Sequence, residues 1–151
     1  MSPIPAGHVA HAGLIALYGR RGWRGVLIQG PSGIGKSDLA LRSLEAGFSL
    51  VSDDRTLLWV SQGRLFGACP PTIAGLIEAR GVGVSPRPAR SFCEISLVVQ
   101  CVGSDTPVER IPVFASHAIL GVACPTLDLR PLEASSPVKL IHALSLLGGE
   151  R

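Results

Sequence analysis

A glycine-rich stretch with one lysine carries the clearest chemical signal in the chain and reads GPSGIGKS over residues 30–37. It matches G-x-x-x-x-G-K-[ST], in which glycines let backbone N–H groups point at phosphate oxygens while the lysine and the hydroxyl serve phosphate and magnesium. The residue frequencies of this chain give a chance match only about 0.3% of the time for this motif definition. The motif therefore predicts a nucleotide-phosphate site made of Gly30, Pro31, Ser32, Gly33, Ile34, Gly35, Lys36 and Ser37.

Two adjacent aspartates, Asp53 and Asp54, follow one predicted helix after this motif, at the end of the stretch LVSDD. In a parallel sheet the strand after a crossover helix lies close to the strand before it, and ligands gather beyond the carboxyl ends of such strands. We therefore expect both carboxylates to reach the phosphate site. One would help to hold magnesium or its waters, and the other would accept a proton from an attacking hydroxyl. The alternative is that residues 53–55 only form a polar turn.

The elements that must position these residues are short. A strand over residues 26–29 should enter the glycine-rich loop and a helix over 37–46 should leave it, so that the positive end of the helix macrodipole faces a bound anion. The remaining pattern predicts strands at 14–18, 48–52 and 94–102, a hairpin at 57–60 and 64–68, a short helix at 73–78, a loop at 81–90 and weak strands within 107–132. A second helix should have Ser136 as its N-cap, Pro137 in its first turn, an apolar face of Val138, Ile141, Leu144 and Leu147, and Gly148 and Gly149 at its end.

Length and composition favour one α/β domain over residues 1–151, with residues 1–10 as a loose lead-in. The net charge of +3 comes from twelve arginines and two lysines scattered along the chain, which gives no reason to expect nucleic acid or membrane as a partner. The four cysteines lie far apart without a metal-ligand spacing, which favours core packing or reduced thiols. Because no eighteen apolar residues run together and no leader pattern opens the chain, we expect a soluble cytoplasmic protein.

Four stretches, in order HAGLIALYG, GPSGIGKSDLALRSLEAG, LVSDD and IEARGVGV, give the chain a resemblance to a known family. Together they resemble the catalytic domain of HPr kinase/phosphorylase, the bifunctional enzyme that acts on a serine of the phosphocarrier protein HPr. The resemblance spans about residues 10–84. It implies an α/β, P-loop-containing fold like the HPr kinase/phosphoenolpyruvate carboxykinase catalytic core, with ATP and Mg as cofactors, an HPr-like protein of the phosphotransferase system as substrate, and a homo-oligomer, a hexamer in the family.

The resemblance also implies a role for individual residues. Lys36 would stabilise the transferred charge, and Ser37 would bind magnesium. Asp54 would take the proton of the acceptor serine and return it in the reverse reaction. Glu78, in the E-x-R-G stretch, would be the other metal ligand, with Arg80 as the alternative ion-pair partner of that glutamate. His11 would lie near the transferred phosphate. His117 and His142 match nothing in the family and are interpreted as structural.

The chain departs from the longer family members at both ends. Their separate N-terminal domain has no counterpart here, and ACPTLDLRPLEASS stands where they have a segment used for dephosphorylation and for docking HPr. Within it only Arg130 could replace the family's arginine. Serine kinase activity is therefore predicted ahead of phosphorolysis, as in the truncated alphaproteobacterial members. Two alternatives stay open: a phosphoenolpyruvate carboxykinase-like small-molecule kinase, and a nucleotide-binding sensor without catalysis.

Overall fold

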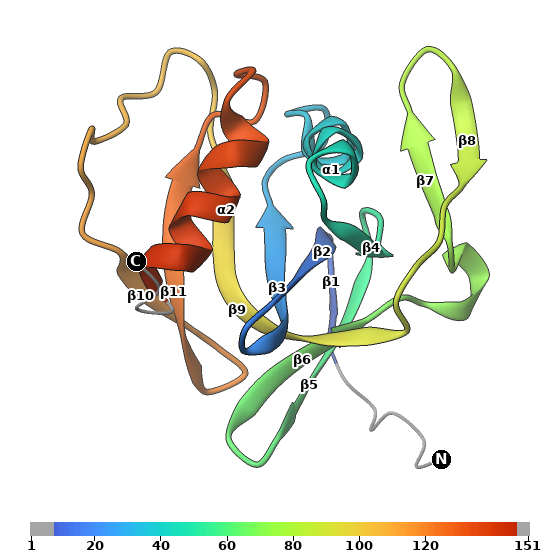
Figure 1. Cartoon of the computed structure of the whole chain (residues 1–151), viewed down its shortest axis with the longest axis horizontal. Coiled ribbons are helices and arrows are strands. Elements are labelled where there is room, and N and C mark those ends of the chain that lie inside the picture. The colour runs from blue at the N-terminus through green and yellow to red at the C-terminus, as the bar shows by residue number, and fades with distance from the viewer. Residues whose placement is uncertain (1–7, 148–151) are drawn as a thin grey trace.

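Short apolar runs separated by glycine turns build a mixed β-sheet of nine strands with two helices packed against it (Figure 1). The computed structural model describes residues 8–147. In chain order the strands of this sheet are β1 (His8–Ala10), β2 (Ala12–Gly19), β3 (Gly22–Gln29), β4 (Ser49–Ser52), β5 (Thr56–Ser61), β6 (Arg64–Ala68), β9 (Phe92–Cys101), β10 (Ala115–Ile119) and β11 (Val122–Leu129). The other elements are the helices α1 (Lys36–Glu45) and α2 (Ser136–Leu147), the 3-10 turn η1 (Pro71–Ile73), and a separate sheet of β7 (Leu76–Ala79) and β8 (Gly83–Pro86).

The centre of the large sheet is parallel and carries the glycine-rich loop. β3, β9 and β11 run parallel, whereas β2 is antiparallel to both of its neighbours, β3 and β4. β4 was expected close to β3; it runs in the same direction as β3, and β2 lies between them. The carboxyl ends of β3 and β4 still meet at one edge of the sheet, so the expected approach of the aspartates to the loop does not depend on direct strand pairing.

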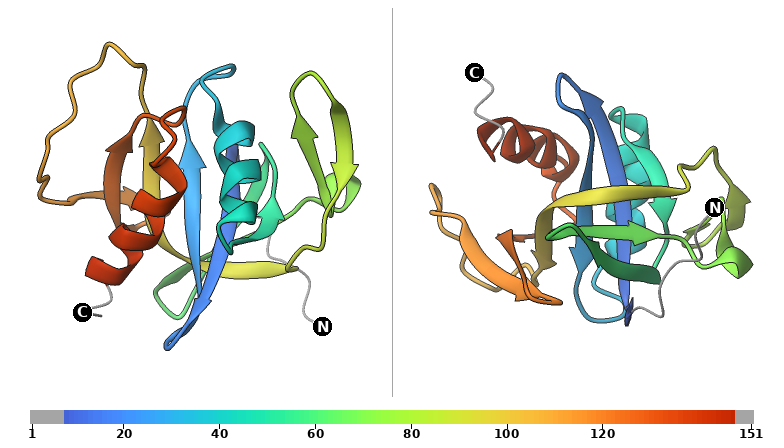
Figure 2. Two further views of the ribbon diagram at one scale, coloured as in Figure 1. Left: turned by 45° about the horizontal axis from the view of Figure 1, so that its top comes forward. Right: turned by 90° about the horizontal axis from the view of Figure 1, so that it is seen from below.

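Alternating side chains bury both faces of the central strands. Val26 and Ile28 of β3 belong to the apolar cluster under α1 and α2, while Leu27 between them belongs to the cluster covered by the β5–β6 hairpin. Figure 2 shows both helices on one side of the sheet and this hairpin on the other. A strand buried on both faces reads as a continuous apolar run, which explains why this strand could be predicted from sequence.

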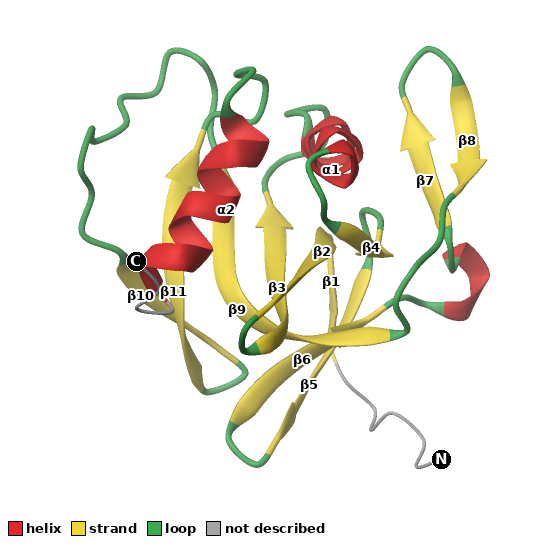
Figure 3. Ribbon diagram, viewed as in Figure 1, coloured by secondary structure: helices red, strands yellow, loops and turns green. Residues whose placement is uncertain are grey.

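The prediction of a short helix over residues 73–78 is wrong. The prediction of a loop over 81–90 is also wrong for residues 83–86, which form a strand. This segment forms the β7–β8 hairpin, which stands apart from the large sheet (Figure 3). Gly75, with a φ of 72°, ends η1 before a helix can form. Gly81 and Gly83, with φ of 86° and 128°, then allow the chain to reverse at the hairpin tip.

The two ends of the described chain also differ from the prediction. Residues 8–10 are not a loose lead-in, because they form β1 and pair with β5. The Ser136 hydroxyl does not cap α2 but donates to the Arg130 carbonyl oxygen at 2.6 Å. Val138 points away from the core with 62% of its surface exposed, whereas Leu140 is fully buried in the face that packs on the sheet. Gly148 and Gly149 lie outside the described residues.

The weak strands predicted within residues 107–132 are the β10–β11 hairpin, which turns at Leu120 and Gly121, both at positive φ. Residues 102–114 form the long connection before it. All four cysteines are free, and Cys93, Cys101 and Cys124 are buried, as core packing predicts. Within residues 8–147, neither helix has the length and hydropathy needed to cross a membrane.

Candidate functional site

The glycine-rich loop joins β3 to α1 and owes its shape to glycines in conformations that other residues avoid. Gly33 and Gly35 have φ of 82° and 114°. Gly35 is the N-cap of α1, and a Cβ at this position would lie 2.8 Å from Leu132 Cδ2. A Cβ on Gly33 would meet no described heavy atom within 4 Å. The loop therefore packs tightly against the protein at Gly35 and faces open space at Gly33, in front of the helix N-terminus.

Lys36 lies over this loop and is 6% exposed. Its ammonium Nζ donates to the carbonyl oxygens of Gly30 at 2.7 Å and of Pro31 at 3.1 Å. Among the described residues no carboxylate pairs with it. A buried cation that is held only by neutral carbonyls gains strongly from an anion, and a phosphate in front of the loop would provide one.

Asp53 connects three elements at the site. One carboxylate oxygen, Oδ1, accepts a hydrogen bond from the Ser37 hydroxyl at 2.7 Å, and the other, Oδ2, accepts one from the backbone N–H of Glu78 at 2.9 Å. Asp53 itself follows β4, Ser37 lies in the first turn of α1, and Glu78 lies on β7. The two bonds bring the Ser37 hydroxyl, the Asp53 carboxylate and the backbone of Glu78 together.

Asp54 pairs with a histidine. Its Oδ1 accepts a hydrogen bond from His11 Nε2 at 2.8 Å, and both side chains are about half exposed. Asp54 has a φ of 66°, and the N–H of Arg55 donates to the Asp53 carbonyl oxygen at 2.8 Å. The segment is therefore a polar turn, as one interpretation of the sequence held, and this turn also directs both aspartates toward the loop.

These groups surround a cavity of about 230 Å³ in front of the glycine-rich loop. Of the predicted loop residues, Ser32, Gly33, Gly35, Lys36 and Ser37 line it, whereas Gly30, Pro31 and Ile34 do not. Both aspartates and Glu78 line it as well, and His11 reaches it through Asp54. Two further lining residues, Asp38 and Arg80, were not predicted to belong to the site. The alternative interpretation of Glu78, an ion pair with Arg80, is not seen between the described side chains.

The donors at this cavity suit a hard cation that is shared with phosphate. Magnesium prefers oxygen ligands and usually combines one or two carboxylates with waters and substrate phosphates. Ser37, Asp53 and Glu78 offer that set. The described residues contain no cluster of three or more His, Cys, Asp or Glu side chains that would hold a metal alone. The site thus fits a metal that arrives with a nucleotide better than a permanently bound one.

The thiols near the loop stay protonated at neutral pH. Burial raises the pKa of Cys101, behind the loop, to about 11, although the Lys36 charge acts in the opposite direction. Burial also raises the pKa of Cys69, helped by the Asp53 charge and opposed by a hydrogen bond with Ser52. Neither cysteine is therefore a nucleophile here. Arg130 does not line the cavity: its Nη2 donates to the Thr106 carbonyl oxygen at 2.7 Å.

Comparison with known proteins agrees with this geometry. The family described as "HPr Serine kinase C-terminal domain" matches residues 5–142. The chain is similar to HPr kinase/phosphorylase of Cupriavidus necator, with 38% identity over 65% of this chain and 33% of that protein, and of Clostridium tetani, with 36% identity over 62% and 29%. It thus spans about a third of these curated relatives. The solved Hpr(Ser) kinase/phosphatase from Coxiella burnetii superposes with a TM-score of 0.77 at 26% identity and covers 95% of this chain and 94% of that one. The predicted fold is confirmed.

Proposed function

Since the chain belongs to the HPr serine kinase C-terminal domain family, we propose that it transfers the γ-phosphoryl group of ATP to a serine of an HPr-like phosphocarrier protein. The observation that carries this proposal is the cavity that brings Lys36, Ser37 and the carboxylates of Asp53, Asp54 and Glu78 together. A loop that only anchored a nucleotide would have no use for a half-exposed aspartate that lines the same cavity and is bonded to a histidine through only one of its oxygens. This aspartate is what favours transfer over sensing.

The residues divide into two groups by their neighbours. The loop N–H groups and Lys36 would bind the phosphates, and Ser37, Asp53 and Glu78 would hold magnesium. When magnesium is bound, it would neutralise part of the negative charge of the phosphates. Asp53 is already fixed by two hydrogen bonds, so it orients its neighbours without rearrangement.

Asp54 acts as the general base. His11 occupies its Oδ1, which leaves Oδ2 for the hydroxyl of the acceptor serine. As the serine oxygen bonds to the γ-phosphorus, the bond from that phosphorus to the bridging oxygen breaks, ADP leaves, and the serine proton moves to Asp54. Arg80, from the β7–β8 hairpin, lines the same cavity and would add a positive charge that stabilises the transferred group.

Kinase activity is proposed ahead of phosphorolysis. Arg130 is the one arginine that could replace the family's C-terminal arginine. It donates to the Thr106 carbonyl oxygen in the connection 102–114, and it does not line the cavity. Phosphorolysis requires inorganic phosphate to bind beside the phosphoserine, and additional cations favour such a site. Only Lys36 and Arg80 supply them among the described residues that line the cavity.

The test is incubation of the protein with labelled ATP and magnesium in the presence of purified HPr proteins. We expect label on one serine of HPr, and Asp54→Asn should lower kcat at least about 100-fold while the Kd for ATP stays within a factor of two. Glu45→Gln, an exposed residue at the far end of α1, is the matched control and should transfer normally. Tight ATP binding without transfer would instead support a sensor, and ADP release with a small-molecule acceptor would support the carboxykinase-like alternative.

A further inference from the structure

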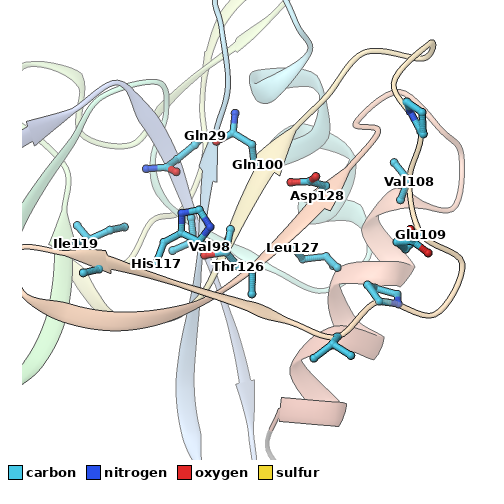
Figure 4. A pocket seen from close by; sticks show the side chains of 15 residues that line it. Gln29, Val98, Gln100, Val108, Glu109, His117, Ile119, Thr126, Leu127 and Asp128 are labelled. Carbon is cyan, nitrogen blue, oxygen red and sulfur yellow. The ribbon is translucent and has the colours of Figure 1, made fainter.

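A second cavity, larger than the one in front of the glycine-rich loop, lies elsewhere on the molecule. It is an open groove of about 630 Å³ on the sheet face opposite to the helices, between β9, β10, β11 and the connection 102–114. We call it the sheet groove and define it by its polar lining residues, Gln29, Gln100, Glu109, His117, Thr126 and Asp128. Figure 4 shows Gln29, Gln100 and Asp128 along its upper end, with His117 and Thr126 below them. None of the roles given above uses it.

Strand register places this groove next to the site. Gln29 is the last residue of β3, directly before the glycine-rich loop. It pairs with Gln100 of β9, and Gln100 pairs with Asp128 of β11. On the other side Gln29 pairs with Ala12, the residue after His11. One polar row therefore runs across the carboxyl ends of three parallel strands and begins beside the His11–Asp54 pair.

The three side chains of this row, Gln29, Gln100 and Asp128, and that of His117 beside it make no hydrogen bond or ion pair with the described residues. The two glutamines are partly buried, and His117 and Asp128 are exposed. Four unpaired polar side chains from four strands face one hollow. This convergence is what a site for a polar ligand needs, and it gives His117 a place in that site.

The acidic charge of the groove indicates which kind of ligand it can bind. Asp128 and Glu109 are acidic, and among the described lining residues none is Lys or Arg, although the chain as a whole carries +3. A triphosphate would be repelled there. A nucleobase would lack an aromatic partner, because no Phe, Tyr or Trp is among the described lining residues. The groove thus favours a basic, hydrogen-bonding segment.

We propose that the sheet groove binds a Lys or Arg side chain of the protein substrate, with Asp128 as its main ionic partner and the two glutamines as hydrogen-bond partners of the adjacent backbone. This inference rests on the proposed function, because it assigns the surface that positions the acceptor protein. Three strand spacings of about 4.8 Å separate β2, beside the transfer site, from β11, which places the two contacts about 14 Å apart. The basic residue then lies about four residues from the serine in an extended segment, or about nine in a helix.

The experiment measures steady-state phosphorylation of purified HPr and, separately, HPr binding by calorimetry. We expect Asp128→Asn to raise the KM for HPr about two- to fivefold and Asp128→Lys about tenfold, with the KM for ATP unchanged within a factor of two. Glu45→Lys makes the same charge change on α1, away from the groove, and should leave both values unchanged. One Lys→Glu or Arg→Glu replacement in HPr should restore the affinity of the Asp128→Lys protein.

Other outcomes overturn the inference. If the KM for HPr does not change in either Asp128 variant, the groove is not the docking surface; if the KM for ATP rises instead, it holds the nucleoside. If the unmodified protein binds HPr but transfers no phosphate, the proposed kinase function fails while the groove is still judged by the Kd of the Asp128 variants. If it neither binds nor phosphorylates HPr, both proposals fail.

Discussion

Replacement of Gly35 by alanine perturbs the glycine-rich loop at the point where it meets α1. Two costs follow from the structure. The new Cβ would be added to a backbone with a φ of 114°, and it would lie 2.8 Å from Leu132 Cδ2 and 3.5 Å from Pro131 Cγ. The first cost is conformational and the second is steric.

The conformational cost is the larger one. A side chain in a sparsely populated backbone region costs about 2 kcal/mol, and the helix fixes this position so that the φ cannot relax. The steric cost is small, because the overlapping atom is the end of a Leu132 side chain that is 69% exposed and can rotate away. We therefore expect Gly35→Ala to lower the free energy of unfolding by about 2 kcal/mol and the Tm by about 4–8 °C. The Kd for ATP should rise, because the same φ aims the loop N–H groups.

Two other glycines calibrate the measurement. Gly25→Ala would place a Cβ 2.6 Å from the Glu94 carbonyl oxygen, which is backbone and cannot rotate away, so it should lower the Tm further. Gly19→Ala meets no described heavy atom within 4 Å and should leave the free energy of unfolding within about 0.5 kcal/mol. Thermal unfolding by circular dichroism and ATP titration of all three variants make the test. A Gly35→Ala protein with the Tm and ATP affinity of Gly19→Ala would refute the reasoning.

Two more predictions follow from the site and the core. His11→Ala removes a half-exposed hydrogen bond to Asp54, worth about 1 kcal/mol, so kcat should fall about fivefold while the Kd for ATP is unchanged; an unchanged kcat would show that the histidine does not orient the base. Burial raises the pKa of both Cys93 and Cys101 from 9.0 to about 11, so between these values the native state retains protons that the unfolded chain has lost. The free energy of unfolding should therefore fall as the pH rises from 9 to 11, and urea titrations should show a shallower fall in a variant with alanine at both positions.

The loop, its flanking strand and its helix could be predicted because their signals are local. The strand is a continuous β-branched and apolar run, and the phosphate motif fixes backbone geometry within eight residues. The spacing from Lys36 to Asp53 contains one helix and one strand, so proximity followed without knowledge of the sheet order. For the same reason, the expected proximity of Asp53 to the loop holds even though β2 lies between β3 and β4.

The rest depends on contacts between distant residues. Residues 73–78 have a helical composition, and only the backbone at Gly75 and the pairing with β8 turn Glu78 onto a strand. The row Gln29, Gln100 and Asp128 is defined by a register that no local pattern encodes, because these residues lie on three strands that are far apart in the sequence. Proximity in sequence suggested Arg80 as a partner of Glu78, but β7 ends at Ala79, so Arg80 lies in the hairpin turn and the strand geometry does not place it beside Glu78.

The β7–β8 hairpin contributes Glu78 and Arg80 to the cavity, so the composition of the site depends on the position of this hairpin. An isolated two-stranded hairpin is marginally stable in water, and this one has no ladder with the large sheet. It is anchored at two points on the same strand: Ile77 is fully buried in the cluster under α1, and the Glu78 N–H bonds to the Asp53 carboxylate. Asp53 therefore belongs both to the anchor of the hairpin and to the proposed metal site, and Glu78 contributes its backbone N–H to the one and its carboxylate to the other. A cation shared by Ser37, Asp53 and Glu78 would hold the hairpin, and with it Arg80, against the phosphate loop, and would thereby couple nucleotide binding to assembly of the cavity proposed for transfer.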